Sequence, residues 1–575
     1  MTILSLFNKP QKTKLAVLIL LSFVASCAEI LNLAIILPII NSFLDINNSL
    51  SHEIINNFLN FFNLQINNLL LFLIFIFISF LIIKACLLIF VSWKTTNFVF
   101  NFIKELSNKL FLRYLTSDYR YISKKNSSEL SRNLIPELDE LNLNLTSFMF
   151  VILEIFILLG VMAFLLIVNP IATLILSSSA LIFGLIYFQL IKTVMENLGL
   201  QRQFAREKQM RFMYEGLSSI KEINIFGRKN FFIDRFKDQN KFLAYISTKF
   251  VFLSQLPRVI FEIFVIFLIA IIFLYLLNTG QSNDEITKFI ALLFAASLRI
   301  LPSIYKIFTC LQNIKYTNPS VKVIYNDLNK ILLKSEKNER NDSITINKSI
   351  DLLITQFKHN DNEEFSLKDI SIKIPKNKKI GLIGKSGSGK STILNILTGL
   401  IKSEKIKILV DSKSINNNLI NWKKLVGLIP QNIFILNDTI KNNILFGIDP
   451  NLVKDEKIFE IIRISNLLPL TYRFKLGIDH NLNEKGTNLS GGEIQRIGIA
   501  RALLHDPKIL LFDEATSALD TFTENEILKE INNLEDKTIF SISHRMNTLK
   551  YCDKIYHLEN GKIIDEGDFQ KFKDK

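Results

Sequence analysis

Long apolar runs dominate the first half of the chain and predict helices that cross a membrane. Six runs are each long enough to span a bilayer, which takes about 20 apolar residues. The predicted spans lie near residues 15–43, 68–93, 141–168, 171–195, 251–278 and 285–312. Only Asn169 and Pro170 separate the third and fourth runs, which predicts a tight turn there. We therefore expect an all-α transmembrane domain with six spans over residues 1–325.

Shorter apolar segments follow these runs and predict a second domain of the α/β class. We expect a linker over residues 326–348 and this second domain over 349–575. The chain is 49% hydrophobic, with a mean hydropathy of +0.28. These values are averages over two different parts, an apolar membrane half and a second half with the composition of an ordinary soluble domain.

Lys and Arg are concentrated in alternate connections between the predicted spans. The N-terminus and segments 94–140 and 196–250 are rich in them, whereas segments 44–67 and 279–284 have none. Because Lys and Arg are retained on the cytoplasmic side, both termini and the two long basic segments are predicted to be cytoplasmic. This topology accounts for much of the formal net charge of +15, so we expect no nucleic-acid partner.

The two basic segments read as helices that leave the membrane, bend and return. Candidate bends lie at Ser117–Tyr119 and at Gly216–Ser219, and we interpret them as docking points for the cytosolic domain. Ordinary helical hairpins without a contact role are the alternative. On the outer side, segment 50–64 has apolar residues at helical spacing, which fits either a short amphipathic surface helix or a packed loop.

Several ionisable residues fall inside the predicted spans, where charge is costly and usually functional. They are Glu29, Lys84, Glu154, Arg258, Glu262, Arg299 and Lys306. In one interpretation these charges pair with one another and determine helix packing. In the other, the cations line a cavity and attract an anionic substrate group such as a phosphate or pyrophosphate. The candidate substrate-binding residues are then Lys84, Arg258, Arg299 and Lys306.

A glycine-rich loop between an apolar strand, 380–383, and a helical pattern predicts a phosphate site. It matches the motif G-x-x-x-x-G-K-[ST], in which backbone N–H groups and a helix N-terminus surround phosphates. Lys390 is expected to reach the β- and γ-phosphates of ATP and the Ser391 hydroxyl to ligate Mg²⁺. The loop comprises Gly384, Lys385, Ser386, Gly387, Ser388, Gly389, Lys390, Ser391 and Thr392.

Three further strand ends carry candidate catalytic residues. Segment 509–514 ends in two acids, of which Asp513 is expected to hold Mg²⁺ and Glu514 to polarise the attacking water. Gln431 ends another apolar strand, from which its amide could reach Mg²⁺ or the attacking water. His544 follows the strand 538–542 and is a candidate contact to the γ-phosphate.

With these motifs the chain resembles an ATP-binding-cassette (ABC) exporter of the type IV half-transporter kind, over essentially its whole length. The most specific element is the signature Leu489-Ser490-Gly491-Gly492-Glu493, followed by Gln495 and Arg496. Gln431 matches the Q-loop, Ser517–Asp520 the D-loop and His544 the H-loop, and Glu484-Lys485-Gly486 precedes the signature. The resemblance implies a six-helix all-α transmembrane domain followed by an α/β P-loop NTPase nucleotide-binding domain, with ATP and Mg²⁺ as cofactors.

The resemblance also implies a homodimer with two equivalent ATP sites. In such proteins two cassettes pack head to tail, so Ser490, Gly491 and Gly492 would face the γ-phosphate held by Lys390 of a second copy. One departure from the family concerns the adenine. The family's usual tyrosine is replaced by His359, so His359 or Phe357 is expected to stack on the base.

Among exporters, the chain most resembles the bacterial flippase of lipid-linked oligosaccharides in protein N-glycosylation. The stretches that carry this likeness are Ser26–Glu29, Leu37-Pro38, Lys84-Ala85, Leu256–Arg258 and Leu298–Pro302. It implies that a polyprenyl-pyrophosphate-linked oligosaccharide is moved from the cytoplasmic to the outer leaflet of the bacterial inner membrane.

A general exporter of a lipid A-like glycolipid, drug or peptide is the alternative. The predicted spans argue against a soluble cassette ATPase of DNA repair or translation. An importer is also disfavoured, because importers usually place spans and cassette on separate chains.

Overall fold

The computed structural model describes residues 4–36, 39, 69–168, 170–277, 283–330, 343–358, 366–416, 418–483, 486–514, 521–532, 536–543 and 549–573. The chain divides into two compact units. One comprises Met1–Ser117 and Tyr121–Leu333, and the other comprises Asp118–Arg120 and Lys334–Lys575. The predicted outer segment 50–64 lies outside the described residues.

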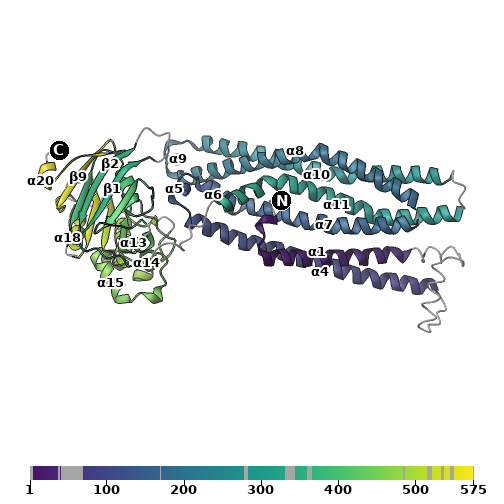
Figure 1. The fold of residues 1–575 in the computed structure, drawn as a ribbon, viewed down its shortest axis with the longest axis horizontal. Coiled ribbons are helices and arrows are strands. Elements are labelled where there is room, and N and C mark those ends of the chain that lie inside the picture. Colours follow the sequence, from purple (N-terminus) through teal and green to yellow (C-terminus); the bar gives the residue numbers. More distant parts are fainter. Residues whose placement is uncertain are drawn as a thin grey trace. The chain divides into compact units, whose positions relative to one another are not determined.

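The first unit is helical, and Figure 1 shows its long helices running alongside one another. Its elements are η1 (Leu4–Leu6), α1 (Lys9–Ala34), α4 (Leu69–Thr116), α5 (Tyr119–Ile122), α6 (Ser127–Leu134), α7 (Pro136–Val168), α8 (Pro170–Ser218), α9 (Ile220–Phe226), α10 (Lys229–Leu277) and α11 (Asn283–Lys330). The helix α7 ends at Val168 and α8 begins at Pro170, and Asn169 of the predicted turn lies outside the described residues.

Within the described residues, five helical stretches are long and apolar enough to cross a membrane. They are Lys9–Asn32, Leu71–Thr116, Ser127–Val168, Thr173–Ser218 and Lys229–Leu274. A helical transmembrane domain is thereby confirmed, whereas the count of six spans stays a prediction. The helix α11 covers the predicted sixth span, but the side chains of residues 283–289 are outside the described set.

The helices α4 and α8 continue far beyond their predicted spans without a break. At a rise of 1.5 Å per residue, the 48 residues of α4 make a helix about 72 Å long. The predicted bends are present at the far ends of both helices. Between α4 and α5 the chain turns at Ser117 and Asp118, and between α8 and α9 it turns at Ser219.

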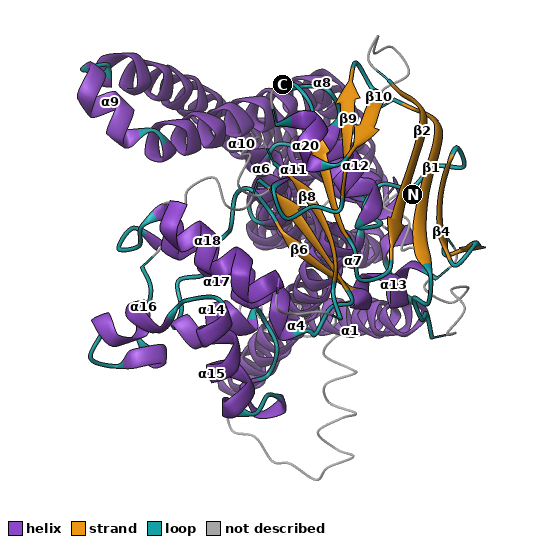
Figure 2. Ribbon diagram, turned by 90° about the vertical axis from the view of Figure 1, so that its left-hand side faces the viewer, coloured by secondary structure: helices purple, strands orange, loops and turns teal. Residues whose placement is uncertain are grey.

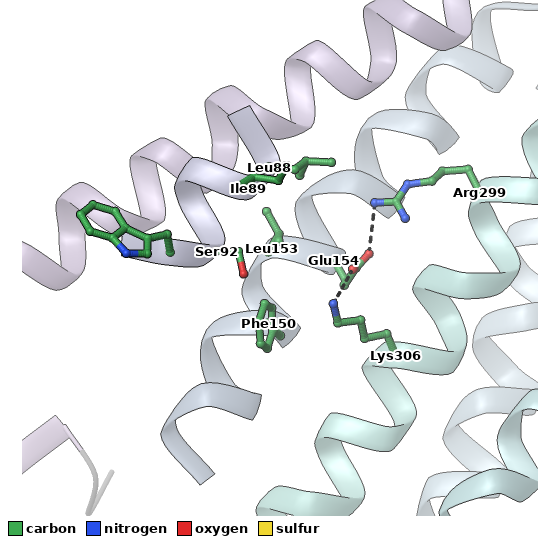
Figure 3. Close-up of a pocket in the computed structure, with 9 residues that line it drawn as sticks. Leu88, Ile89, Ser92, Phe150, Leu153, Glu154, Arg299 and Lys306 are labelled. Atoms are coloured by element: carbon green, nitrogen blue, oxygen red, sulfur yellow. Dashed lines mark ion pairs between the residues drawn. The ribbon is translucent and has the colours of Figure 1, made fainter. Parts of the chain in front are cut away.

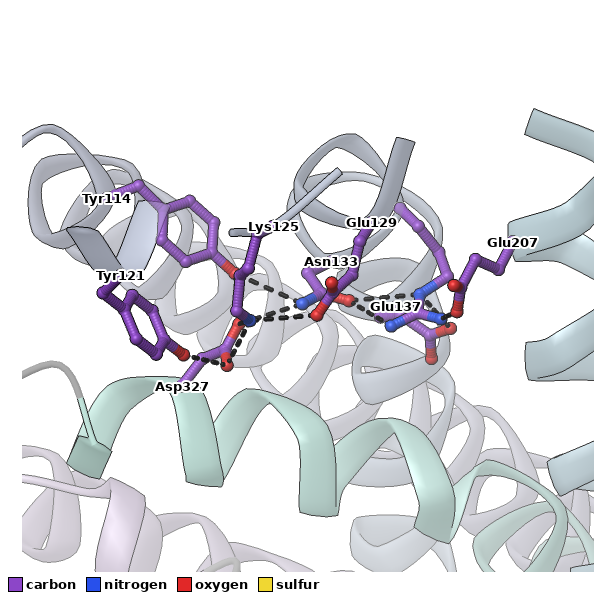
Figure 4. A network of polar contacts seen from close by, with 9 residues as sticks. Tyr114, Tyr121, Lys125, Glu129, Asn133, Glu137, Glu207 and Asp327 are labelled. Atoms are coloured by element: carbon purple, nitrogen blue, oxygen red, sulfur yellow. Dashed lines mark hydrogen bonds and ion pairs between the residues drawn. The ribbon is translucent and has the colours of Figure 1, made fainter. Parts of the chain in front are cut away.

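A buried carboxylate ties the end of α11 to the end of α4 and to the segments that follow it. Asp327 accepts hydrogen bonds from the hydroxyl of Tyr114 at 2.5 Å, from Asn133 at 2.9 Å and from Lys125 at 3.0 Å (Figure 4). Burial would lower the pKa of Lys125, but the hydrogen bonds and charges of Glu129 and Asp327 outweigh it and raise that pKa. The carboxylate is therefore fully compensated, as a buried charge must be.

The second unit contains two sheets and a helical layer (Figure 2). Its strands are β1 (Ser349–Phe357), β2 (Leu367–Pro375), β3 (Lys379–Ile383), β4 (Ile406–Val410), β5 (Lys413–Ser414), β6 (Val426–Ile429), β7 (Ile509–Asp513), β8 (Thr538–Ile542), β9 (Lys554–Glu559) and β10 (Lys562–Gly567). Its helices are α12 (Lys390–Leu397), α13 (Leu419–Leu425), α14 (Ile440–Leu445), η3 (Pro450–Leu452), α15 (Asp455–Ile464), α16 (Leu468–Arg473), η4 (Gly477–Asp479), α17 (Gly491–Leu504), α18 (Thr521–Asn532) and α20 (Phe569–Phe572).

The larger sheet has the order β10-β9-β3-β8-β7-β6, and its central pairs β3–β8, β8–β7 and β7–β6 are parallel. The smaller sheet, β2-β1-β4-β5, is antiparallel. Parallel strands bring their carboxyl ends to one edge, where ligands bind in open α/β sheets. The predicted strands at 380–383, 509–514 and 538–542 are confirmed as β3, β7 and β8.

The two larger apolar cores of this unit are separate from each other. One joins both sheets to α12 and α13, with Trp422 fully buried, and the other lies under α14, α15 and α17. The side chains of β7 alternate between the two cores. Ile509 and Leu511 belong to the first, and Leu510 and Phe512 to the second. Such alternation is the natural geometry of a strand covered on both faces.

Candidate nucleotide site and membrane cavity

The predicted phosphate loop connects β3 to α12 in the strand–loop–helix context that its motif requires. Three of its glycines, Gly384, Gly387 and Gly389, have φ angles of +155°, +80° and +106°, which favour residues without a Cβ. Lys390 begins α12, and its ammonium donates to the carbonyl oxygens of Gly384 at 2.7 Å and Lys385 at 2.9 Å. The lysine therefore closes the loop around the space where phosphates would bind.

Two carboxylates lie opposite this lysine at the end of β7. Burial raises the pKa of Asp513, and the neighbouring charge of Glu514 raises it further. Burial lowers the pKa of Lys390, and the charges of Glu514 and Asp513 partly restore it. Perturbed groups of opposite charge gathered at one sheet edge are the electrostatic mark of a functional site.

Glu514 is held in place from two neighbouring strands. Its backbone has a φ of +50°, and its N–H donates to the carbonyl oxygen of Ile542 at the end of β8. The Gln431 side chain, just after β6, donates to a carboxylate oxygen of Glu514 at 3.0 Å. The structure thus brings together two residues that the sequence places 83 positions apart.

The oxygen donors near the loop suit Mg²⁺, which binds through few protein ligands and keeps water and phosphate oxygens. Ser391 is exposed in the first turn of α12 and Asp513 ends the adjacent strand, so these two are the fitting ligands. Within the described part of the chain there is no cluster of three or more His, Cys, Asp or Glu residues able to hold a metal. When bound, Mg²⁺ would neutralise charge on the transferred phosphate.

The signature residues begin α17 with a complete capping box. Ser490 is the N-cap, its hydroxyl accepts from the N–H of Glu493, and the Glu493 carboxylate accepts from the N–H of Ser490 at 2.7 Å. Arg473 pairs with the same carboxylate at 2.8 Å and also donates to the Asn488 carbonyl. Sequence reasoning missed Arg473, because nothing in its local sequence marks it as a support of the signature.

Several predicted site residues lie outside the described residues and stay predictions. They are His359, Glu484, Lys485, Ser517–Asp520 and His544. The other candidate for the adenine, Phe357, is 5% exposed and packs in the first core. Its role toward adenine stays a prediction.

In the helical unit, five of the charged residues inside the predicted spans form one chain of ion pairs. Lys84 lies 2.9 Å from Glu29, and Arg299 lies 3.0 Å from the same carboxylate. Arg299 also approaches Glu154 at 3.6 Å, and Lys306 approaches Glu154 at 3.8 Å. The interpretation that these charges pair with one another is therefore supported for this group.

Part of this group borders a cavity of about 530 Å³ (Figure 3). Glu154, Arg299 and Lys306 line it, and Figure 3 shows the Glu154 carboxylate between the two cations. Its other lining residues are Leu88, Ile89, Ser92, Trp93, Phe150 and Leu153. Two of the four candidate substrate residues thus reach the cavity, whereas Lys84 turns to Glu29, and Arg258 is exposed on α10 and not among the lining residues.

Comparison with known proteins identifies the class. Residues 15–298 match the family model of the ABC transporter transmembrane region, and residues 367–517 match that of the ABC transporter. The chain therefore belongs to the ABC transporters, with a transmembrane region and an ATP-binding domain on one polypeptide. The predicted class, an ATPase coupled to transport, is supported by this domain pair.

Individual relatives refine the picture. An "ATP-dependent lipid A-core flippase" of Wigglesworthia glossinidia brevipalpis is 32% identical over 64% of this chain and 63% of its own length. A protein of the same name from Vibrio cholerae is 35% identical over 41% of each chain. The chain thus spans less than two thirds of the curated relatives it matches. The structure of a bacterial Atm1-family ABC exporter with ATP bound has a TM-score of 0.77 at 19% identity, covering 99% of this chain and 97% of that one, and confirms the exporter fold.

Proposed function

We propose that the protein is an ATP-driven flippase that moves an amphipathic lipid with an anionic headgroup out of the cytoplasmic leaflet. The observation that carries this proposal is the cavity between membrane-crossing helices, where Arg299 and Lys306 face an otherwise largely apolar wall. Cations in a membrane interior are costly and suit a negatively charged cargo. Two relatives named as lipid A-core flippases support a glycolipid as the cargo class.

ATP hydrolysis in this proposal uses the residues at the sheet edge. Lys390 and the N–H groups of the phosphate loop bind the β- and γ-phosphates, and Asp513 and Ser391 hold Mg²⁺. Glu514 takes the proton of the attacking water, while Gln431 positions that carboxylate through its hydrogen bond. His544 and Asp520 are proposed to complete the site around the γ-phosphate.

The working unit is proposed to be a homodimer in the bacterial inner membrane, with both termini cytoplasmic. Ser490, Gly491 and Gly492 then close the site around ATP held by Lys390 of the partner subunit, because the start of α17 presents backbone N–H groups to an anion. The bends near Asp118 and Gly216 are proposed to pass the closure of the ATP sites to the membrane helices.

The finer assignment of the cargo is a polyprenyl-pyrophosphate-linked oligosaccharide. It rests on the likeness to the lipid-linked oligosaccharide flippase and on the cationic cavity. A lipid A-like glycolipid is the second candidate, and the relatives named for that cargo favour it. Both cargoes carry phosphate next to long apolar chains, so the cavity suits either.

Reconstitution in proteoliposomes tests the function and separates the two cargoes. The purified protein is expected to translocate a fluorescent lipid-linked glycan or lipid A in an ATP-dependent way. The Glu514→Gln variant in matched vesicles is the control. Equal translocation with and without ATP, or by the Glu514→Gln variant, would refute the proposal. The ratio of rates for the two lipids identifies the preferred cargo.

A further inference from the structure

We infer that Glu154 is an internal counter-anion of the membrane cavity, which the phosphate of a lipid cargo displaces from Arg299 and Lys306. This inference rests on the proposed function, because it presumes a cargo with an anionic headgroup. It assigns the phosphate to these two cations and gives Lys84 a different role, that of neutralising Glu29. Glu154 then determines how strongly the cavity holds its cargo.

The distances around Glu154 indicate a carboxylate that is anchored by a neutral group. Its closest partner is the Ser303 hydroxyl, which donates to one carboxylate oxygen at 2.8 Å. The two cations lie at 3.6 and 3.8 Å, beyond the range of a hydrogen bond between heavy atoms. The cations are thus attracted to Glu154 through space and are not bound tightly to it.

Arg299 forms ion pairs with two carboxylates and also lines the cavity. Its Nε lies 3.0 Å from Glu29, a carboxylate whose side chain is 3% exposed. Its Nη2 is the atom nearest to Glu154. A guanidinium oriented in this way can offer donors to a phosphate while its position remains set by Glu29.

Lys306 is the more accessible cation of the pair. Its side chain is 45% exposed, whereas that of Glu154 is 5% exposed. Its ammonium lies 4.3 Å from the centre of the Phe150 ring, a cation–π contact that holds it at the cavity wall. An entering anion therefore meets Lys306 before it meets the carboxylate.

The ion pairs around the cavity have an excess of positive charge, which favours the binding of an anion. Lys84, Arg299 and Lys306 are three cations against the two carboxylates Glu29 and Glu154, so one positive charge is in excess. The apolar residues of the wall, such as Leu88 and Leu153, lower the local dielectric and strengthen this attraction. In the predicted orientation Lys306 lies nearer to the cytoplasmic end of its span, at 312, than to the outer end, at 285, which fits loading from the cytoplasmic leaflet.

The test is a binding measurement on the full-length protein in nanodiscs without ATP. The probe is a short-chain fluorescent phosphatidic acid, and the comparison ligands are the matching diacylglycerol and inorganic phosphate. Replacing Glu154 by glutamine keeps the size of the side chain and an acceptor for Ser303 but removes the competing charge. We expect Glu154→Gln to bind the phosphatidic acid on the order of tenfold more tightly and Lys306→Gln about tenfold more weakly.

Two further variants separate charge from shape and position. Glu154→Asp keeps the charge and is expected to show no gain in affinity. Lys315→Gln removes a lysine of the same helix that also lies over an aromatic ring, that of Phe188 at 5.9 Å, but does not line the cavity. Its affinity is expected to equal that of the wild type. Thermal unfolding of each variant shows whether it is folded.

An unchanged or weaker affinity in folded Glu154→Gln, or a loss in Lys315→Gln equal to that in Lys306→Gln, would overturn the inference. Inorganic phosphate that binds as tightly as the lipid would overturn the assignment to a lipid headgroup. A different result would contradict the proposed function. If the wild-type protein binds the probe in this pattern but does not translocate lipid with ATP, then the proposed transport is wrong and the inference about Glu154 still holds.

Discussion

At the scale of single residues, the contact between Gln431 and Glu514 is the observation closest to the chemistry. A general base that takes a proton from water contributes about 10²- to 10⁴-fold to a rate. We therefore expect Glu514→Gln to bind ATP with nearly normal affinity and to release phosphate at least about 100-fold more slowly. Phosphate release and binding of a fluorescent ATP analogue measure the two quantities.

Glu456→Gln is the matched control for this change, because Glu456 lies exposed in the first turn of α15. It should leave turnover unaltered. Near-normal turnover in Glu514→Gln would show that another group takes the proton.

The raised pKa of Asp513 predicts a cost in stability at neutral pH. Burial and the charge of Glu514 favour the protonated form of Asp513 in the folded protein. The contribution of Asp513 to the free energy of unfolding is therefore greatest below the ordinary Asp pKa of about 3.9 and falls as the pH rises through the raised pKa. In the absence of nucleotide and Mg²⁺, Asp513→Asn should raise the Tm at pH 7, and the gain should shrink as the pH is lowered into the acid range.

Thermal unfolding at several pH values checks this expectation. Asp479→Asn is the control, because Asp479 is exposed in η4 of the same unit. A Tm of Asp513→Asn below that of the wild type at pH 7 would contradict the electrostatic account.

At the scale of elements, the phosphate loop depends on Gly384 more than on Gly387. A Cβ on Gly384 would lie 2.2 Å from the carbonyl oxygen of Leu558 and 2.9 Å from the Ser388 hydroxyl, whereas one on Gly387 meets nothing within 4 Å. Both have positive φ, so each alanine costs about 1–3 kcal/mol of backbone strain, and Gly384→Ala adds a backbone clash.

We expect Gly384→Ala to lose ATP binding and Gly387→Ala to retain folding with weakened binding. Nucleotide binding and thermal unfolding measure the two effects. If both variants bind ATP equally, then the close approach of Gly384 to Leu558 is not what shapes the loop.

The start of α17 depends on Ser490 in two separable ways. Ser490→Ala removes the N-cap, which costs about 1 kcal/mol, and removes the hydroxyl that the proposed dimer presents to ATP. Ser490→Thr keeps both the cap and a hydroxyl. The alanine variant should show a lower Tm and slower ATP turnover, and the threonine variant should be close to wild type in Tm. Equal Tm values for the two would contradict the capping role.

The sequence predicted most of these elements because their patterns are local. The P-loop motif predicts the strand before it and the helix after it, and the acids after 509–512 identify the end of a buried strand. The contact from Gln431 to Glu514 depends on the sheet order β7-β6, and the pairing of Lys84 with Glu29 depends on how α4 packs on α1. Neither can be read from spacing along the chain. The same holds for Ser303, a common residue in apolar helices, whose bond to Glu154 appears only in the fold.

At the scale of the whole molecule, the proposed dimer predicts which cysteines can be joined. One chain would carry Ser490→Cys and another Ser386→Cys, each with the native cysteines replaced by serine. Ser386 lies exposed in the phosphate loop. A short bifunctional thiol reagent with ATP and Mg²⁺ should then give a dimer band from the mixture of the two chains.

Either variant alone should give little of this product, which serves as the control. A chain with both substitutions that crosslinks only within itself would contradict the shared ATP sites. Gel electrophoresis of the reacted proteins distinguishes these outcomes.

The position of β7 between two cores has a mechanical consequence. Neighbouring side chains of this strand pack in different cores. Leu510 and Phe512 pack in the core under the helical layer, and Ile509 and Leu511 pack in the core of the sheets. A rotation of the helical layer would therefore move the strand that ends in Asp513. We expect a tilt of the helical layer relative to the sheets to shift the carboxylates of Asp513 and Glu514 at the end of β7, while each core keeps its own packing.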